Sequence, residues 1–317
     1  MALALLALSG LAACKPEQAP RQVTLGLSWI HQAQFSGPYY ADRHGLYREE
    51  GLEARFVPAT IDSDPLDEFI AGKYDFVIAQ PDTLIAARLK GHRLKAVAVT
   101  YRIHPLVFLS LPSSGIIRPQ DFRGKTIGVA YSEKQILMAL LKKMSIDAGE
   151  VTIVKRSHDF DSLRSGDIEV QAGWVTDELQ TARRTGLALN VISPYDYGIT
   201  FYADLLTVRE SLIENEPELV AKFVRATQRG WVAALQDPSA SAKLPLHYDP
   251  ALDPEHELQV LRATAPLVHT GADQIGWMRA RDWEDMIGSL YEQGVIAERL
   301  PAEDLFTTRF LEAARPK

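Results

Sequence analysis

From residue 23 onward, short apolar stretches alternate with longer stretches of mixed polarity, and this pattern predicts strands alternating with helices. The first round of the pattern predicts strands at 23–29, 52–57, 75–79 and 94–101, separated by helices at 39–50, 66–71 and 81–90. Gly51 follows the first of these helices and Pro81 begins the last, which are positions that these residue types favour. The alternation is typical of a parallel sheet covered by helices.

The pattern starts again near residue 124 and later gives way to helices. It predicts strands at 124–130, 151–155, 170–174 and 188–192, with helices at 133–144, 161–165 and 180–185. Beyond residue 201 the chain is expected to be mostly helical, with helices at 217–235, 254–263 and 282–293. We therefore expect an α/β fold with two lobes that face each other across a cleft, and a ligand bound at the carboxyl ends of strands.

The N-terminal residues predict export and a lipid anchor. Residues 1–13 are apolar, end in small residues and resemble a lipoprotein signal peptide, with Leu11, Ala12 and Ala13 directly before Cys14. This resemblance implies cleavage before Cys14 and acylation of its sulfur, whereas the alternative is a buried free thiol in an N-terminal helix. Residues 14–22 are polar and rich in proline, as in a flexible tether. We expect the protein in the cell envelope, anchored on the outer face of the cytoplasmic membrane or in the periplasm or outer membrane.

Composition narrows the class of protein. A folded part of roughly 300 residues favours two domains over one. The net charge of −7 argues against nucleic acid as a partner, because nucleic acid requires a basic surface. Cys14 is the only cysteine, and neither His-Glu-x-x-His nor paired cysteines occur, so neither a metal nor any other cofactor is expected. A Gly-x-Ser-x-Gly elbow and a Walker A loop are also absent from the sequence, and we do not expect an enzyme.

Several motifs resemble those of a known family. They are Trp29-Ile-His-Gln-Ala-Gln-Phe-Ser-Gly37, Tyr39-Tyr-Ala-Asp-Arg-His-Gly-Leu-Tyr-Arg-Glu-Glu-Gly-Leu52, Gly72-Lys-Tyr-Asp-Phe-Val-Ile-Ala79, Asp121-Phe-Arg-Gly-Lys-Thr-Ile-Gly-Val129, Tyr195-Asp-Tyr-Gly-Ile-Thr-Phe-Tyr202, Glu216-Pro-Glu-Leu-Val220 and Ala226-Thr-Gln-Arg-Gly-Trp231. In this order they resemble periplasmic solute-binding proteins of ABC importers. The branch is the one related to thiamine-pyrimidine-precursor binders and to nitrate, sulfonate and taurine binders, and the first and fifth motifs are most similar to the pyrimidine-precursor branch.

This resemblance implies an architecture and a set of partners. It implies the type II periplasmic-binding-protein fold, in which two crossovers join the lobes and the ligand lies in the cleft between them. The expected lobes are 23–105 with 199–317, and 106–198. The implied partners are a small-molecule ligand and the permease of an ABC transporter, and the chain is expected to act as a monomer.

Candidate ligand contacts in the first lobe follow its expected strands: Trp29, Gln32, Gln34, Phe35, Gln80 and Asp82. An indole at a strand end can stack on a heteroaromatic ring, or it can pack in the core. Glutamine amides offer donors and acceptors to ring nitrogens and an exocyclic amine, although amides in such loops also cap helices or face solvent. Asp82 has a second possible role, as a helix cap.

Tyr131, Ser132 and Glu133 are candidates at the equivalent strand-to-helix position of the second lobe. Further candidates are Trp174, Asp177 and Glu178, expected near the first return from the second lobe, and Tyr197 and Tyr202, which bracket the second crossover. Ser132 is also a possible helix cap. Asp177 and Glu178 favour an amine-bearing or cationic ligand over a sulfonate or nitrate, because anion sites use arginine or backbone N–H groups. Their alternative role is a solvated loop. Tyr197 and Tyr202 are candidates for closing the cleft or for packing between the lobes.

Three functions follow from these observations. The first is a binding protein for a thiamine pyrimidine precursor, with riboflavin or another flat heterocycle second and a small anion third. The second is a pyrimidine-precursor synthase, since eukaryotic synthases resemble this chain. Those enzymes carry a cysteine-rich iron-binding motif, and Cys14 is the only cysteine here. The third is a sensory domain that binds a ligand and signals to a partner.

Overall fold

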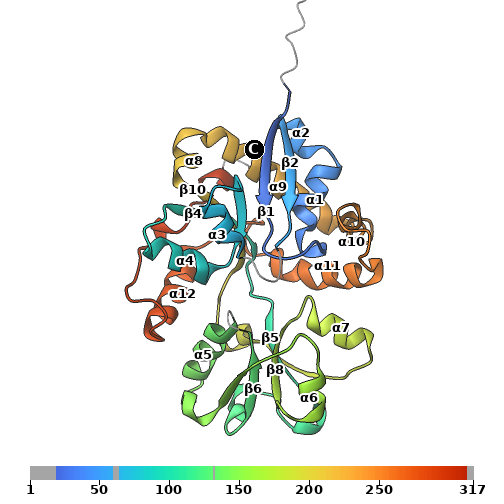
Figure 1. The fold of residues 1–317 in the computed structure, drawn as a ribbon, viewed down its shortest axis with the longest axis vertical. Coiled ribbons are helices and arrows are strands. Elements are labelled where there is room, and N and C mark those ends of the chain that lie inside the picture. Colours follow the sequence, from blue (N-terminus) through green and yellow to red (C-terminus); the bar gives the residue numbers. More distant parts are fainter. Residues whose placement is uncertain (1–18, 60–63, 131–132, 313–317) are drawn as a thin grey trace, which may run out of the picture.

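Two five-stranded sheets, each covered by helices, form the molecule (Figure 1). The structure is a computed structural model and describes residues 19–59, 64–130 and 133–312. The chain builds part of the first sheet, crosses to build the whole second sheet, and crosses back to complete the first (Figure 1). These two crossings are residues 102–105 and 193–202.

The first sheet has the strand order β2-β1-β3-β10-β4. Its strands are β1 (Arg21–Gly26), β2 (Leu52–Val57), β3 (Phe76–Ala79), β4 (Leu94–Tyr101) and β10 (Ala203–Arg209). The helices packed with it are α1 (Ser36–Arg43), α2 (Leu46–Glu49), α3 (Pro65–Ile70), α4 (Pro81–Leu89), α8 (Glu210–Asn215), α9 (Pro217–Gln236), α10 (Pro238–Ser241), α11 (Pro254–Val268), α12 (Ala280–Glu292) and α13 (Arg309–Glu312).

The second sheet has the strand order β7-β6-β8-β5-β9. Its strands are β5 (Leu106–Ser110), β6 (Thr126–Val129), β7 (Thr152–Lys155), β8 (Val170–Trp174) and β9 (Asn190–Ile192). The helices α5 (Lys134–Lys143), α6 (Asp161–Ser165) and α7 (Glu178–Arg184) surround it (Figure 1).

Both sheets are mixed, so the expectation of purely parallel sheets is wrong. β10 runs antiparallel to β3 and β4, and β5 runs antiparallel to β8 and β9. Each antiparallel strand is the first strand after a crossing. A strand that arrives from the other sheet begins at the edge where its parallel neighbours end, and it must therefore run in the opposite direction.

Other differences from the sequence-based elements have local causes. The helix expected at 39–50 is broken into α1 and α2 at Gly45, whose φ of 74° lies in the left-handed region. The strand expected at 23–29 ends at Gly26, so Trp29 lies in the loop that follows it. The sequence analysis missed β5 and β10. β5 is a short, mostly apolar buried run, and β10 is buried although it contains Asp204, Thr207 and Arg209, so neither shows the regular alternation that marks an amphipathic strand.

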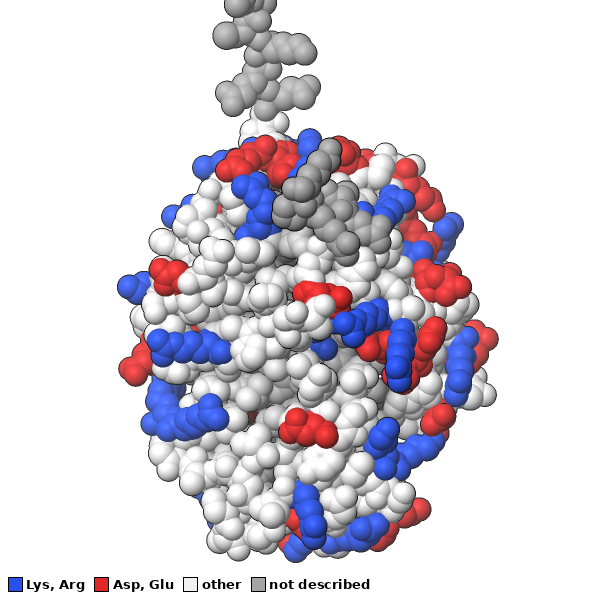
Figure 2. Space-filling model, turned by 180° about the vertical axis from the view of Figure 1, so that it is seen from behind, with Lys and Arg blue, Asp and Glu red and all other residues white. Residues whose placement is uncertain are grey.

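Side chains from α1, α9 and the first sheet form one of the hydrophobic cores, which includes Tyr39, Phe76 and Phe223. A separate core lies under the second sheet and includes Phe108 and Leu140. None of the helices in the described part of the chain is long and apolar enough to span a membrane. On the face shown in Figure 2, acidic and basic side chains are interspersed among uncharged ones.

Two glycines allow α1 and α9 to pack closely. A Cβ atom added to Gly230 of α9 would lie 2.1 Å from the Gly37 carbonyl oxygen of α1. A Cβ atom added to Gly37 would lie 2.3 Å from the Trp231 ring. Neither helix can therefore accept a side chain at these positions without moving apart.

We expect Gly230→Ala to destabilise the protein, although alanine normally favours a helix. Overpacking of this kind costs about 1–3 kcal/mol, which exceeds the gain of about 1 kcal/mol from helix propensity. Gly288→Ala in α12 is the matched control, because an added Cβ there meets no atom within 4 Å. Urea denaturation should show a lower free energy of unfolding for the first variant and a higher one for the control. Stabilisation by both substitutions would contradict this account of the α1–α9 contact.

Candidate functional site

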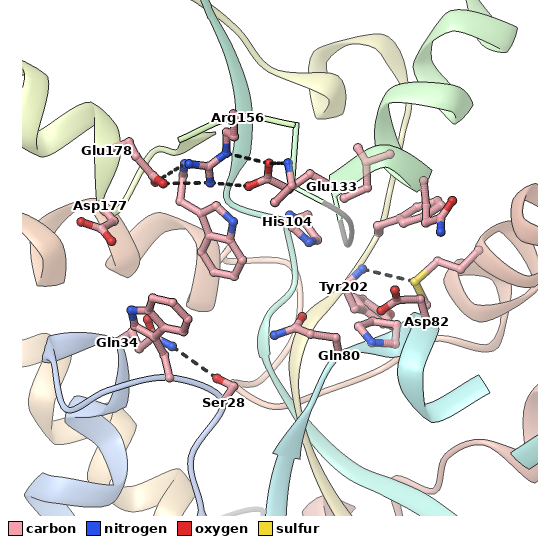
Figure 3. Close-up of a pocket in the computed structure, with 18 of the residues that line it drawn as sticks. Ser28, Gln34, Gln80, Asp82, His104, Glu133, Arg156, Asp177, Glu178 and Tyr202 are labelled. Atoms are coloured by element: carbon pink, nitrogen blue, oxygen red, sulfur yellow. Dashed lines mark hydrogen bonds and ion pairs between the residues drawn. The ribbon is translucent and has the colours of Figure 1, made fainter. Parts of the chain in front are cut away.

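A pocket of about 380 Å³ lies between the two sheets (Figure 3). Many of its lining residues follow β1, β3, β6 and β7, end β8, or precede β5 and β10. The carboxyl ends of parallel strands therefore meet the starts of both antiparallel strands at this pocket. The lining residues are Ser28, Trp29, Gln32, Gln34, Gln80, Pro81, Asp82, His104, Ala130, Glu133, Gln135, Ile136, Arg156, His158, Trp174, Asp177, Glu178, Phe201, Tyr202, Met286 and Leu290.

On the first-sheet side, three lining side chains share one buried carboxylate. Asp204 accepts hydrogen bonds from Ser28 Oγ at 2.9 Å and from Gln80 Nε2 at 2.8 Å. It also accepts one from Gln34 Nε2 at 3.3 Å. Gln34 Oε1 in turn accepts from Gln32 Nε2 at 2.6 Å. Burial raises the pKa of Asp204 to about 6. Ser28, Gln34 and Gln80 lie together on one side of the pocket (Figure 3).

The start of α4 places a further acid in the pocket. Gln80 is the residue before Pro81, where the helix begins, and its carbonyl oxygen accepts a hydrogen bond from Thr83 Oγ1 at 2.9 Å. Asp82 follows in the first turn, where a carboxylate interacts favourably with the helix dipole. Burial nevertheless raises the pKa of Asp82.

On the second-sheet side, Arg156 is held by two carboxylates (Figure 3). Its Nε and Nη2 atoms lie 2.8 and 2.6 Å from the two carboxylate oxygens of Glu133, and Nη2 lies 2.9 Å from Glu178 Oε1. The three side chains are only 4%, 5% and 8% exposed. Backbone N–H groups also hold both acids, from Ala130 to Glu133 at 2.7 Å and from Trp174 to Glu178 at 2.8 Å. The cluster of two carboxylates and one guanidinium carries one net negative charge.

Asp177 brings another carboxyl group to this wall. Burial, followed by the neighbouring Glu178 carboxylate, raises the pKa of Asp177 to about 6. Its Oδ1 atom lies 3.8 Å from Nε2 of His256, which belongs to α11 on the first-sheet side. His158 also reaches across, because its ring centroid lies 6.2 Å from that of Trp29. Asp177 and His158 therefore stand where the two sides of the pocket meet.

Trp174 and His104 line the pocket side by side. Their ring centroids are 5.4 Å apart at an interplanar angle of 66°. His104 Nδ1 accepts a hydrogen bond from the Leu106 N–H at 3.1 Å, which places the proton of the neutral ring on Nε2. Burial lowers the pKa of His104 to about 3, so the ring is neutral at physiological pH. His104 thus brings no charge to the pocket.

The structure brings together most of the residues predicted from the sequence: Trp29, Gln32, Gln34, Gln80, Asp82, Glu133, Trp174, Asp177, Glu178 and Tyr202 line the pocket. Phe35 does not line it, because this side chain is 1% exposed and its ring meets the Tyr39 ring edge-on in the core. Tyr197 packs against the second-sheet core instead. Tyr131 and Ser132 lie outside the described residues. That the lining side chains contact a ligand stays a prediction.

Sequence reasoning missed several lining residues, some of which had a usable signal. Arg156 and His158 follow an expected strand at 151–155, so the strand-end rule that singled out Gln80 applies to them as well. His104 lies in a crossing whose position became clear only with β5. Met286 and Leu290 come from α12, and nothing in the local sequence places that helix beside the pocket.

The donors in the described part of the chain do not form a metal site. No group of three or more histidine, cysteine, aspartate or glutamate side chains in residues 19–59, 64–130 and 133–312 is arranged to hold a metal ion. The pocket chemistry that the structure supports is hydrogen bonding, aromatic contact and charge compensation.

Comparison with known proteins places the chain in a family. The family described as NMT1/THI5 like matches residues 32–241. The chain belongs to this family. This confirms the resemblance that the motifs indicated. Among solved structures, the aliphatic sulphonate binding protein SsuA from Escherichia coli has a TM-score of 0.73 at 15% identity, over 90% of this chain and 91% of that one. This likeness confirms the expected periplasmic-binding-protein fold.

Relatives of this NMT1/THI5-like chain carry names of two kinds. The riboflavin-binding protein RibY of Chloroflexus aurantiacus is 27% identical over 95% of this chain and 89% of its own length. A formylaminopyrimidine-binding protein of Halalkalibacterium halodurans is 25% identical over 96% of each chain. A 4-amino-5-hydroxymethyl-2-methylpyrimidine phosphate synthase of Legionella pneumophila is 24% identical over 92% of each chain. Binding proteins and an enzyme thus both occur among the relatives.

We expect Asp177→Asn to raise the melting temperature at pH 7.5. The pKa of Asp177 in the folded protein is about 6, which is above its ordinary value of 3.8, so folding favours the protonated form. The stability that this group contributes is therefore present below about pH 4 and is lost as the pH rises through about 6. Asparagine stays neutral, so the gain of the variant should disappear at pH 4.

Thermal unfolding at pH 4, 6 and 7.5 measures this effect. Asp196→Asn serves as the control, because Asp196 is exposed and does not line the pocket. A gain for Asp177→Asn that stays constant across the three pH values would show that the substitution acts by something other than the charge.

Proposed function

We propose that this chain is the ligand-binding component of an ABC importer and that it holds a small, flat heteroaromatic molecule between its two sheets. A thiamine pyrimidine precursor is the first candidate, and riboflavin is the second. The observation that carries the proposal is the pocket itself, which combines aromatic rings with an excess of hydrogen-bond acceptors. The family and the names of the two binding relatives support it.

The charges of the pocket disfavour a small anion. Arg156 is the only lysine or arginine among the described residues that line the pocket, and Glu133 and Glu178 already occupy its guanidinium. Asp82 and Asp177 add two more carboxyl groups. A sulfonate or nitrate entering this pocket would meet carboxylates and would find no free guanidinium. The fold shared with a sulphonate binding protein does not bear on this point, because one fold serves many ligands.

The aromatic side chains favour a flat ligand. Trp29 from the first-sheet side and Trp174 from the second-sheet side both line the pocket, together with Phe201 and Tyr202. Indole faces stack on heteroaromatic rings, and neither indole is fully covered by the protein. A molecule with a flat ring and N–H groups at its edge matches both the rings and the carboxylates.

The enzyme alternative has a specific weakness. Some relatives are named as pyrimidine phosphate synthases, and the cysteine-rich iron-binding motif that this resemblance implies needs several thiolates. The chain contains one cysteine, Cys14. We therefore favour binding without chemistry. Incubation of the protein with a confirmed ligand, followed by mass spectrometry of the small molecule, tests this, because any conversion of the ligand would favour the enzyme.

Calorimetry with a panel of compounds tests the ligand class. We expect binding of 4-amino-5-hydroxymethyl-2-methylpyrimidine, its formylamino analogue or riboflavin, and no binding of ethanesulfonate or nitrate. A ligand at about one hundred times its Kd should also raise the free energy of unfolding by about 2.7 kcal/mol. Binding of the sulfonate alone would overturn the proposal.

We expect Trp29→Leu to fold normally and to bind the aromatic ligand about 10- to 100-fold more weakly, since a stacked ring contributes about 1–3 kcal/mol. Leucine retains apolar contact with the core against which Trp29 packs. Val232→Ala, at an exposed position on α9, is the control for general effects on the protein. Normal binding by a folded Trp29→Leu variant would place the ligand elsewhere.

We further propose that the chain is exported and anchored through Cys14, which lies outside the described residues. The apolar leader that ends directly before Cys14 supports this. We expect the mature N-terminus to be an acylated cysteine and Cys14→Ser to release the protein from membranes. Mass spectrometry of the N-terminus and membrane fractionation measure these outcomes. An unmodified thiol in the native host would contradict the anchor.

A further inference from the structure

Asp204 lies in an unusual position for an acidic residue. It is the second residue of β10, directly behind the pocket wall, and its side chain is fully buried. Its φ of 54° lies in the left-handed region, which aspartate and asparagine tolerate better than most other residues. The backbone conformation therefore accounts for an aspartate or an asparagine at this position. It does not account for a carboxylate, because a buried carboxylate costs more than the neutral amide of asparagine.

The hydrogen bonds of Asp204 fix the direction of two amides. An ionised carboxylate only accepts hydrogen bonds, so the amide nitrogens of Gln34 and Gln80 must face it. The distances are 3.3 Å from Gln34 Nε2 and 2.8 Å from Gln80 Nε2. The Ser28 hydroxyl also donates to Asp204, at 2.9 Å. Three side chains that line the pocket thus each donate a hydrogen bond to the buried Asp204 carboxylate.

As a consequence, glutamine amide oxygens remain free to accept hydrogen bonds from a ligand. Gln34 Oε1 accepts a hydrogen bond from Gln32 Nε2, so the orientation of the Gln34 amide also fixes that of the Gln32 amide. The Oε1 atoms of Gln32 and Gln80 accept no hydrogen bond from any other residue that the structure describes. Both residues line the pocket, and Gln80 projects towards its centre (Figure 3). The first-sheet wall therefore offers acceptors, as the carboxylates of the opposite wall do.

We propose that Asp204 is a positioning residue that sets the hydrogen-bond polarity of the pocket, so that the protein selects flat ligands with N–H donors and rejects isosteres without them. This inference rests on the proposed function and narrows its ligand class. Asp204 acts through Gln34 and Gln80 and does not itself line the pocket. A site built around a particular donor discriminates strongly, because the wrong ligand leaves its buried acceptors unpaired.

The variant Asp204→Asn tests the proposal. Asparagine has nearly the same size and tolerates the left-handed backbone, but it offers one acceptor oxygen and one NH₂ donor. At least one of the two glutamine amides must then turn its oxygen towards the asparagine. A reversed Gln80 amide turns its nitrogen towards the pocket directly, whereas a reversed Gln34 amide turns its nitrogen towards Gln32 and thereby reverses the Gln32 amide as well. Asp75→Asn is the matched control, because Asp75 precedes β3 of the same sheet, accepts a hydrogen bond from the Thr24 N–H and does not line the pocket.

The probes are 4-amino-2-methylpyrimidine and 4-methoxy-2-methylpyrimidine, which differ in one N–H donor group. We expect the wild type and Asp75→Asn to prefer the amino compound by about tenfold or more, which corresponds to about one hydrogen bond. Asp204→Asn should reduce this ratio of Kd values to about threefold or less. If the wild type binds riboflavin and not pyrimidines, riboflavin and its N3-methyl derivative form the pair.

The outcomes separate this inference from the proposed function. If Asp204→Asn weakens both probes by the same factor and leaves the ratio unchanged, Asp204 is only structural and the inference is wrong, while the proposed function stands. A wild type without any preference for the donor also overturns the inference alone. A wild type that binds ethanesulfonate and none of the heterocycles overturns both. If Asp204→Asn fails to fold, the same ratio of Kd values is measured on Gln80→Met, which removes one of the oriented amides directly. An unchanged ratio in that variant would overturn the inference.

Discussion

The position of the pocket depends on one constraint, which is that the chain crosses between the sheets at the edge where the parallel strands end. A strand that begins at such a crossing must run antiparallel to its neighbours, as β5 and β10 do. This arrangement brings strand ends from both sheets, together with the starts of the two antiparallel strands, to one place. Gln80, Arg156, His104 and Asp204 are far apart in sequence, and all four lie at this junction because of it.

Charge compensation then determines what the junction can hold. Arg156 is buried between Glu133 and Glu178. A buried ion pair of this kind adds little net stability, but it fixes the positions of the three side chains relative to one another. Without Arg156, two buried carboxylates would face each other unpaired. With it, the wall is ordered and still carries one net negative charge. The guanidinium is therefore paired within the wall and is not itself available to an anion.

The sequence predicts the fold class and much of the site, because both follow from local patterns. Alternation located β2, β4 and β8 at their observed bounds, and the strand-end rule located Trp29 and Gln80 near the pocket. The rest depends on tertiary structure. Asp204 belongs to a strand without alternation, and its role comes from three donors that lie between 124 and 176 residues away in the sequence.

Acidic side chains from the two sides also approach each other at this junction. Asp177 from the second-sheet side lies close enough to Glu257 of α11 that, together with burial, which is the larger cause, it raises the pKa of Glu257 to about 7. Bringing the two sides together therefore brings acids together. Two ion pairs that join the two sides, Lys142 with Glu292 and Arg184 with Asp253, are exposed, and such pairs contribute little to stability. Under the proposed function, a ligand that donates a hydrogen bond to Asp177 would offset part of this repulsion, so that its binding and the approach of the two sides would stabilise each other.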